Sequence, residues 1–231
     1  MGCRVVAISP TDGAGGEQLG AIIARELGFQ LINEEIVAEA AREAGVGPEV
    51  VADVERRKSV LSRVLASLGE LAPATASGMS GHGAATWDVG PSRDLLRDLI
   101  RSVVWECAER GNVVIVAHAA SLALAKRTDV LRVWITASPE TRARRIAEAQ
   151  NITEAEANKV LARGDANRAD YLKRFYGASS ELPTHYDIVL NTDRVESEEA
   201  AELILRAAAL SRSRPFGRSA RGLASPGPDR P

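Results

Sequence analysis

The stretch ISPTDGAGGEQLG, residues 8–20, joins an apolar run to an amphipathic one. The run before it, RVVAIS at residues 4–9, is typical of a short buried strand. Residues 15–27 place Leu19 and Ile23 on one face, which predicts a helix. Glycines in a strand-to-helix turn let backbone N–H groups converge, and the positive end of the helix favours an anion. The pattern indicates a phosphate-binding loop, although a plain glycine-rich turn fits the same residues.

The loop departs from the full phosphate-loop pattern, G-x-x-x-x-G-K-[ST], at its charged positions. Aligned on Gly15, it has Gly16 in place of the lysine and Glu17 in place of the hydroxyl residue. A carboxylate ~6 Å from a phosphate charge repels it by roughly 3 kcal/mol at an effective dielectric of ~20. The favourable interaction of an anion with a helix N-terminus contributes only ~0.3–1 kcal/mol. Glu17 therefore either binds a magnesium ion, or points to water and complements the helix dipole. The candidate nucleotide-binding residues are Gly13, Ala14, Gly15, Gly16, Glu17 and Gln18.

Beyond this loop, short apolar runs alternate with amphipathic segments. Further strands are predicted at residues 29–33, 112–118, 130–136 and 186–192. Helices are predicted at 34–44, 48–71, 93–110 and 119–126, and another begins at Ser138. A further helix is predicted from 153 to Tyr176, with an interruption at Gly164 left open. The last is predicted from about Ser197 to near Leu210. This order predicts an α/β fold with a five-stranded parallel sheet and right-handed crossovers. Ligands in such sheets bind at the carboxyl ends of the strands, so the loops after residues 9, 33, 117 and 136 matter for function.

Composition indicates one domain over residues 1–210 with two irregular segments. Residues 73–92 are rich in Gly, Ala, Ser and Thr and are predicted to form a mobile loop. Residues 211–231 hold five arginines among Ser, Gly and Pro, which predicts a disordered basic tail. Such a tail could contact RNA or an acidic partner, or simply remain solvated.

The charge balance argues against two classes of partner. The 231-residue chain has 31 acidic and 29 basic residues, so neither nucleic acid nor a membrane surface is expected as its main partner. No apolar stretch approaches the ~18 residues of a membrane span. Cys3 and Cys107 are far apart and the three histidines are dispersed, so no metal-ligand set is predicted. A reduced, cytoplasmic location is expected, and the oligomeric state stays open.

Three segments resemble a known family. VLRVWITASPETRARRIAEAQ, residues 130–150, resembles a strand and the following helix of cytidylate kinases. GFQLINEEIV (28–37) and RGDANRADYLKRFYG…THYDIVLNT (163–192) are similar to the cytidylate kinase-like family. The resemblance implies a P-loop kinase-like three-layer fold with a five-stranded parallel sheet and a helical lid. It also implies γ-phosphoryl transfer from ATP, with Mg²⁺, to a nucleoside monophosphate such as CMP.

The resemblance also implies lid arginines that close over the transferring phosphate. Arg142 and Arg145 are three residues apart and share a helix face, and Arg168 follows Asp165 by about one turn. These four residues are the candidate catalytic group. Surface helices carry many arginines, so a merely solvated role stays open for each of them.

Several positions depart from the family pattern. Arginines common in the family are missing at Pro10 and Glu17, and His118 stands where an arginine commonly faces the substrate. His118 either donates to a phosphate, with a charge that varies near neutral pH, or is a neutral histidine at a strand end. Asn33 stands where aspartate is common, with Glu34 beside it. Asn33, Glu34 and His118 are the candidate substrate-binding residues. Because basic groups are lost, the alternative is a degenerate kinase domain that binds nucleotide or a protein partner without catalysis.

Overall fold

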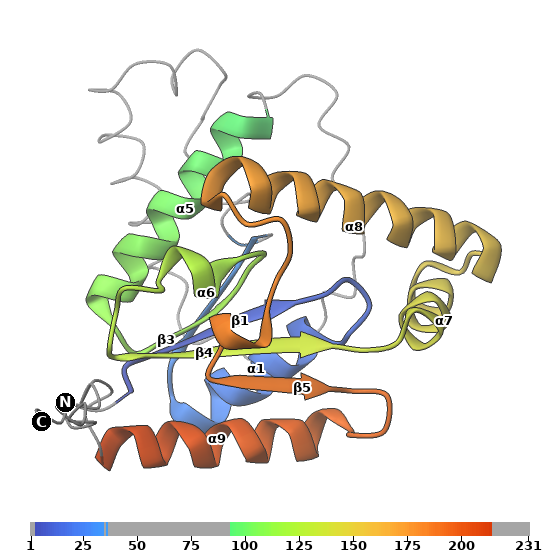
Figure 1. Ribbon diagram of the computed structural model, residues 1–231. Helices are drawn as coiled ribbons and strands as arrows, with labels where there is room; N and C mark the ends of the chain where they lie inside the picture. Colours follow the sequence, from blue (N-terminus) through green and yellow to red (C-terminus); the bar gives the residue numbers. More distant parts are fainter. Residues whose placement is uncertain (1–2, 35, 37–92, 214–231) are drawn as a thin grey trace, which may run out of the picture.

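A five-stranded sheet forms the centre of the fold. The structure is a computed structural model that describes residues 3–34, 36 and 93–213. The strands are β1 (Val5–Pro10), β2 (Gln30–Asn33), β3 (Val113–Val116), β4 (Val130–Thr136) and β5 (Ile188–Asn191). They lie in the order β2-β3-β1-β4-β5, and every neighbouring pair is parallel (Figure 1). The predicted α/β fold with a five-stranded parallel sheet is confirmed. The loop after β1 therefore leaves the middle of the sheet.

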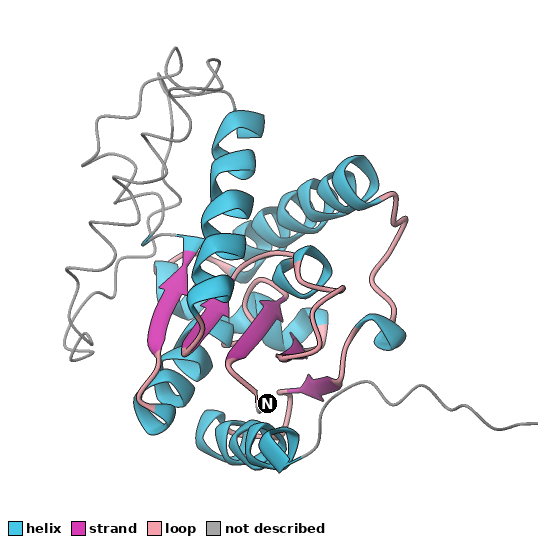
Figure 2. Cartoon of the chain, turned by 90° about the vertical axis from the view of Figure 1, so that its left-hand side faces the viewer, coloured by secondary structure: helices cyan, strands magenta, loops and turns pink. Residues whose placement is uncertain are grey.

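Helices cover both faces of this sheet (Figure 2). One face packs against α1 (Gly16–Leu27) and α9 (Ser197–Ser213), and the other against α5 (Arg93–Arg110) and the short α6 (Ala120–Ala123). Alternate residues of β1 enter the two cores, with Val6 and Ile8 in the first and Val5 and Ala7 in the second. All four are fully buried, as expected of a central parallel strand.

The lid prediction corresponds to a hairpin of α7 (Pro139–Gln150) and α8 (Glu154–Tyr176). Ser138 caps α7 by accepting from the Thr141 amide, and Thr153 forms the predicted capping box at the start of α8. The two helices share a small apolar cluster of their own, made of Ala143, Ile146, Ala147, Ala157 and Leu161.

The break considered at Gly164 is wrong, because α8 runs through it without interruption. A glycine here serves close packing instead. A Cβ atom at residue 164 would lie 2.3 Å from Asp12 Oδ2, so any larger residue here would require the carboxylate of Asp12 to shift.

Two helix boundaries differ from the sequence prediction. The helix predicted at 119–126 is only Ala120–Ala123, preceded by Ala119 in a left-handed conformation. The last helix runs to Ser213, so the first three residues of the predicted tail are helical. The helices predicted at 34–44 and 48–71 lie almost wholly outside the described residues, and the loop at 73–92 and the tail from 214 lie entirely outside them. Within the described ranges, no helix has both the length and the apolar character of a membrane span.

Candidate phosphate-binding site

The loop between β1 and α1 turns sharply at two glycines. Gly13 and Gly15 have φ angles of 77° and 83°, in the left-handed region that glycine adopts without strain. Gly15 caps α1 without a side-chain hydrogen bond, and the first helical bond is from the Leu19 amide to the Gly15 carbonyl oxygen, at 3.2 Å. The amides of Gly13, Gly15 and Gly16 donate no hydrogen bond within the described part of the chain. Three free N–H groups thus gather at the positive end of a helix, as an anion requires.

The carbonyl oxygens of the same loop are all occupied. The Thr11 carbonyl accepts from the Ala14 amide, at 3.0 Å. The other donors come from distant parts of the chain: Arg168 Nη1 to Pro10 (2.6 Å), Arg142 Nε to Asp12 (2.6 Å), Arg145 Nη1 to Gly13 (3.5 Å, a long contact) and Thr192 Oγ1 to Ala14 (3.0 Å).

The tethered carbonyls orient the free amides. A trans peptide unit is planar, with its C=O and N–H pointing in opposite directions. The Asp12 carbonyl shares its unit with the Gly13 amide, and the Ala14 carbonyl shares its unit with the Gly15 amide. The donor on the Asp12 carbonyl therefore directs the Gly13 amide away from Arg142, and the donor on the Ala14 carbonyl directs the Gly15 amide away from Thr192.

The three candidate arginines thus contact the loop backbone, and two of them also pair with acids. Arg142 forms a fork with both oxygens of Asp165, at 2.6 and 3.1 Å. Asp165 is half exposed, with 49% of its side-chain surface open to water. Arg145 instead bonds to the hydroxyl and carbonyl of Thr192, at 2.9 and 2.7 Å. Direct contact of these arginines with a phosphate stays a prediction.

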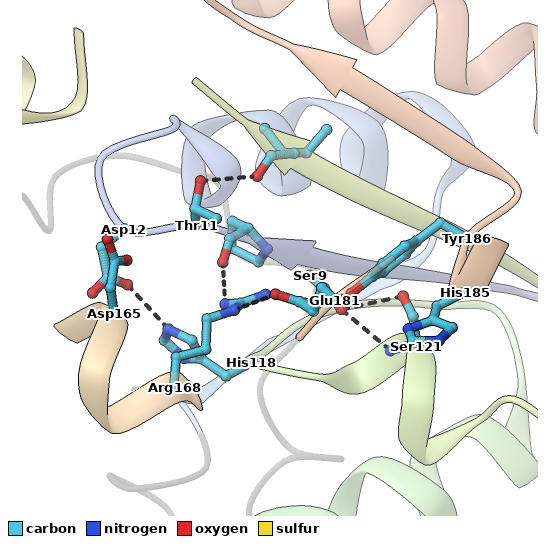
Figure 3. Close-up of polar contacts among 12 residues, drawn as sticks. Ser9, Thr11, Asp12, His118, Ser121, Asp165, Arg168, Glu181, His185 and Tyr186 are labelled. Carbon is cyan, nitrogen blue, oxygen red and sulfur yellow. Dashed lines mark hydrogen bonds and ion pairs between the residues drawn. The ribbon is translucent and has the colours of Figure 1, made fainter. Parts of the chain in front are cut away.

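Arg168 is part of a buried network (Figure 3). It donates to both oxygens of Glu181, at 2.5 and 2.8 Å, and Tyr186 Oη also donates to Glu181. The side chains of Arg168 and Glu181 are 7% and 6% exposed. Burial and Glu181 raise the pKa of Tyr186 above its usual range, so its hydroxyl stays protonated. This network fixes α8 to the segment before β5, which includes the 3₁₀ helix Pro183–His185.

His118 lies between the carboxylates of Glu34 and Asp12, at the ends of three strands; Figure 3 shows it beside Asp12. Its Nδ1 is 2.9 Å from Glu34 Oε1 and its Nε2 is 3.0 Å from Asp12 Oδ1, while its backbone amide donates to Glu34 at 2.6 Å. The negative charge of Glu34 raises the pKa of His118 to about 10, against the opposing effect of desolvation. The hydrogen bond from His118 lowers the pKa of Asp12. His118 is therefore an imidazolium across the neutral range, and both expectations from the sequence, a neutral ring and a charge that varies near pH 7, are corrected.

Glu17 does not simply point to water. Its Oε2 accepts from Asn33 Nδ2 at 2.8 Å, and Asn33 Oδ1 accepts from the Ile36 amide at 2.8 Å. Asn33 thereby joins the first turn of α1 to the end of β2. Gln18 lies on the exposed side of the same turn. Among the described residues, His, Cys, Asp and Glu side chains form no group of three that could hold a metal ion.

Four residues of this site were missed in the sequence: Asp12, Glu181, Tyr186 and Thr192. Asp12 and Thr192 could have been found, because Asp12 follows the first predicted strand and Thr192 ends the last one, at the carboxyl edge of the sheet. Glu181 lies in an irregular segment between α8 and β5, where no periodic pattern indicates its partner.

The glycine loop after a central parallel strand and the α7–α8 hairpin closed over it define a P-loop kinase-like α/β protein. The chain belongs to the cytidylate kinase-like family, whose model matches residues 5–194.

Related sequences agree with this membership, and a solved structure shares the fold. A cytidylate kinase of Ignicoccus hospitalis is 36% identical over 108 residues, which are 46% of this chain and 62% of that protein. A cytidylate kinase of Methanopyrus kandleri is 30% identical over 107 residues, 43% of this chain and 55% of that protein. The matches thus span little more than half the length of these relatives. An uncharacterized protein of Eubacterium ventriosum has a crystal structure that matches 89% of this chain and 98% of its own, with a TM-score of 0.58 and 17% identity, which shows a shared fold.

Proposed function

We propose that this protein is an ATP-dependent phosphotransferase that binds the polyphosphate of ATP on the loop at residues 13–18. The acceptor implied by the family resemblance is a nucleoside monophosphate such as CMP. One observation carries the proposal: three free amides meet at the start of α1, while the loop carbonyls are held on donors. Such a loop presents positive dipoles to a phosphate without needing a lysine.

The neighbouring residues have roles that follow from their exposure. Asp165 is half exposed, so a phosphate oxygen can replace it on the Arg142 fork at modest cost. Arg168 is held by a buried acid and stays in place, positioning the loop through the Pro10 carbonyl. The imidazolium of His118 supplies a cation beside the ends of β1 and β3, where an acceptor would lie.

Magnesium would arrive with ATP and neutralise charge on the transferring group. A hard oxygen ligand from the protein would be the carboxylate of Glu17, in the first turn of α1 beside the loop glycines. The carboxylate of Glu17, which alone would repel a phosphate, then becomes favourable.

The direct test is a set of reactions with Mg-ATP and each nucleoside monophosphate, in which diphosphate products are measured by chromatography. We expect turnover with at least one acceptor, and Arg142→Met should lower kcat at least about tenfold because a charge-assisted contact to phosphate is lost. A folded protein that yields no diphosphate with any acceptor would rule out the nucleotide kinase activity.

A second candidate function is nucleotide binding without catalysis. It is favoured by the three carboxylates of Asp12, Glu17 and Glu34 near the loop and by the commitment of Arg142 and Arg168 to acids. Calorimetry with ATP, CMP and CDP separates the two functions, because a degenerate domain should bind at least one nucleotide yet show no product. The variant Glu17→Arg should then raise ATP affinity, whereas in an active enzyme it should abolish turnover.

A further inference from the structure

We propose that Thr192 is a positioning residue of the phosphate-binding loop, and that it also holds the positive charge of Arg145 behind that loop. The role presupposes the nucleotide binding proposed above. Thr192 directly follows β5, at the opposite end of the chain from the loop, and is only 6% exposed. Neither a motif nor the resemblance had assigned it a role.

The hydroxyl of Thr192 can donate one hydrogen bond, and two carbonyl oxygens lie close enough to accept it. Ala14 lies at 3.0 Å and Thr136 at 3.3 Å. The Thr136 carbonyl already accepts from the Thr192 backbone amide, at 2.8 Å. The proton is therefore directed to Ala14, and the lone pairs on the other side of the oxygen accept from Arg145 Nη1, at 2.9 Å.

Through the Ala14 carbonyl, Thr192 fixes the Gly15 amide. The two groups belong to one planar peptide unit, so holding the oxygen sets the direction of the N–H. This unit needs a tether because Gly15 has no Cβ and a left-handed φ of 83°, which makes rotation of its flanking peptides inexpensive. Without the hydroxyl, the Gly15 amide is free to turn away from a phosphate.

Arg145 differs from the other two arginines in its charge balance. Arg142 and Arg168 each form a fork with a carboxylate, which neutralises them. In the described ranges, Arg145 contacts no carboxylate: its partners are the hydroxyl and carbonyl of Thr192 and, at 3.5 Å, the Gly13 carbonyl. Arg145 therefore leaves an uncompensated positive charge behind the glycines, on the side opposite to the free amides.

The test compares Thr192→Val, which removes only the hydroxyl, with Thr192→Ser, which keeps it. Thr141→Val is a matched control: Thr141 is 7% exposed and lies on α7, but its hydroxyl bonds to Ser138 and not to the loop. Each full-length variant is titrated with Mg-ATP and with magnesium tripolyphosphate by calorimetry. Hydrogen exchange of the Ala14 amide, which donates to Thr11, is measured without ligand.

We expect Thr192→Val to weaken binding of both ligands about tenfold and to speed exchange at Ala14, while Thr192→Ser and Thr141→Val behave like the wild type. Arg145→Met should weaken tripolyphosphate binding at least as much, because the charge itself is lost.

Three results would overturn the proposal. If the wild type binds both ligands and Thr192→Val binds them equally well, the positioning role fails while the proposed function stands. If Thr141→Val weakens binding as much as Thr192→Val, the effect is general destabilisation and the positioning role fails again. If the wild type binds neither ligand, the proposed function and the role of Thr192 fail together.

Discussion

At the scale of single residues, His118 lies between the carboxylates of Asp12 and Glu34. Its raised pKa reflects these two acids, with the positive charge of Arg168 acting against them. Between these acids, His118 carries a positive charge across the neutral pH range. Unlike arginine, it has only two ring donors, and both are occupied.

The first prediction concerns the pH dependence that this setting creates. The pKa of His118 is about 10 in the folded chain and near 6.5 when unfolded, so its stabilising effect is complete below pH 6.5 and is lost as pH rises towards 10. Between pH 7 and pH 10 the wild type should lose about 1 kcal/mol more stability than His118→Gln, a modest value because water screens a ring that is over a third exposed. Urea unfolding at each pH measures it. Parallel stability curves for the two proteins would contradict the prediction.

A second prediction at this scale concerns Gly13. A Cβ atom there would lie 2.7 Å from the carbonyl oxygen of Arg142, and φ is 77°. Gly28 is the control, since it has φ of 65° and open space around it. Gly28→Ala should cost about 1–2 kcal/mol from the backbone alone, whereas Gly13→Ala should cost about 1–3 kcal/mol more, because α7 must move away. Equal losses of stability in thermal unfolding would show that α7 does not constrain the loop.

At the scale of elements, α8 has two arginine–carboxylate forks in opposite surroundings. Arg168–Glu181 is buried, whereas Arg142–Asp165 has a half-exposed acid. The first holds α8 against the segment before β5, and the second joins α8 to α7. The buried Arg168–Glu181 pair should therefore have a structural role, whereas the half-exposed acid of the Arg142–Asp165 pair should be replaceable by another anion.

The third prediction compares the two pairs by neutral substitutions. Glu181→Gln leaves the buried charge of Arg168 without a counterion and should cost about 3–5 kcal/mol. Asp165→Asn leaves Arg142 beside a water-exposed partner and should cost under about 1 kcal/mol. Chemical denaturation measures both, and the double variant Arg168→Met/Glu181→Leu should be more stable than Glu181→Gln alone. A costly Asp165→Asn would mean that this pair is also a fixed part of the fold.

At the scale of the whole molecule, the free loop amides predict that the phosphates of ATP, and not its base, provide the main contact. A ligand at 100 times its Kd stabilises the folded state by about 2.7 kcal/mol, which raises Tm by about 5–10 °C in a chain of this size. We expect this shift from a non-hydrolysable ATP analogue with magnesium and from magnesium tripolyphosphate, but not from adenosine, which has no phosphate. Differential scanning fluorimetry is sufficient. An equal shift from adenosine would place the main contact on the base.

The sequence predicted the elements better than their contacts. The strands and the helices around them have clear periodicity. The glycines at 13 and 15 indicate either an anion-binding loop or a plain tight turn. The partners of Arg142, Arg145 and Arg168 were not predictable, because they depend on how closely the α7–α8 hairpin approaches the loop. Gly164 lies at that approach, against the carboxylate of Asp12, although in the sequence it looked like a helix breaker.

The bond between Thr192 and Ala14 joins residues 178 positions apart. During synthesis on the ribosome, the glycine turn emerges early, but the groups that order it come from the last strand and the hairpin before it. A nascent chain stopped before β5 would have a free Ala14 carbonyl in the loop and an unpaired edge on β4. An open strand edge favours aggregation or chaperone capture over premature nucleotide binding. Competence to bind should therefore arise late and in one step, when the fifth strand pairs with the fourth.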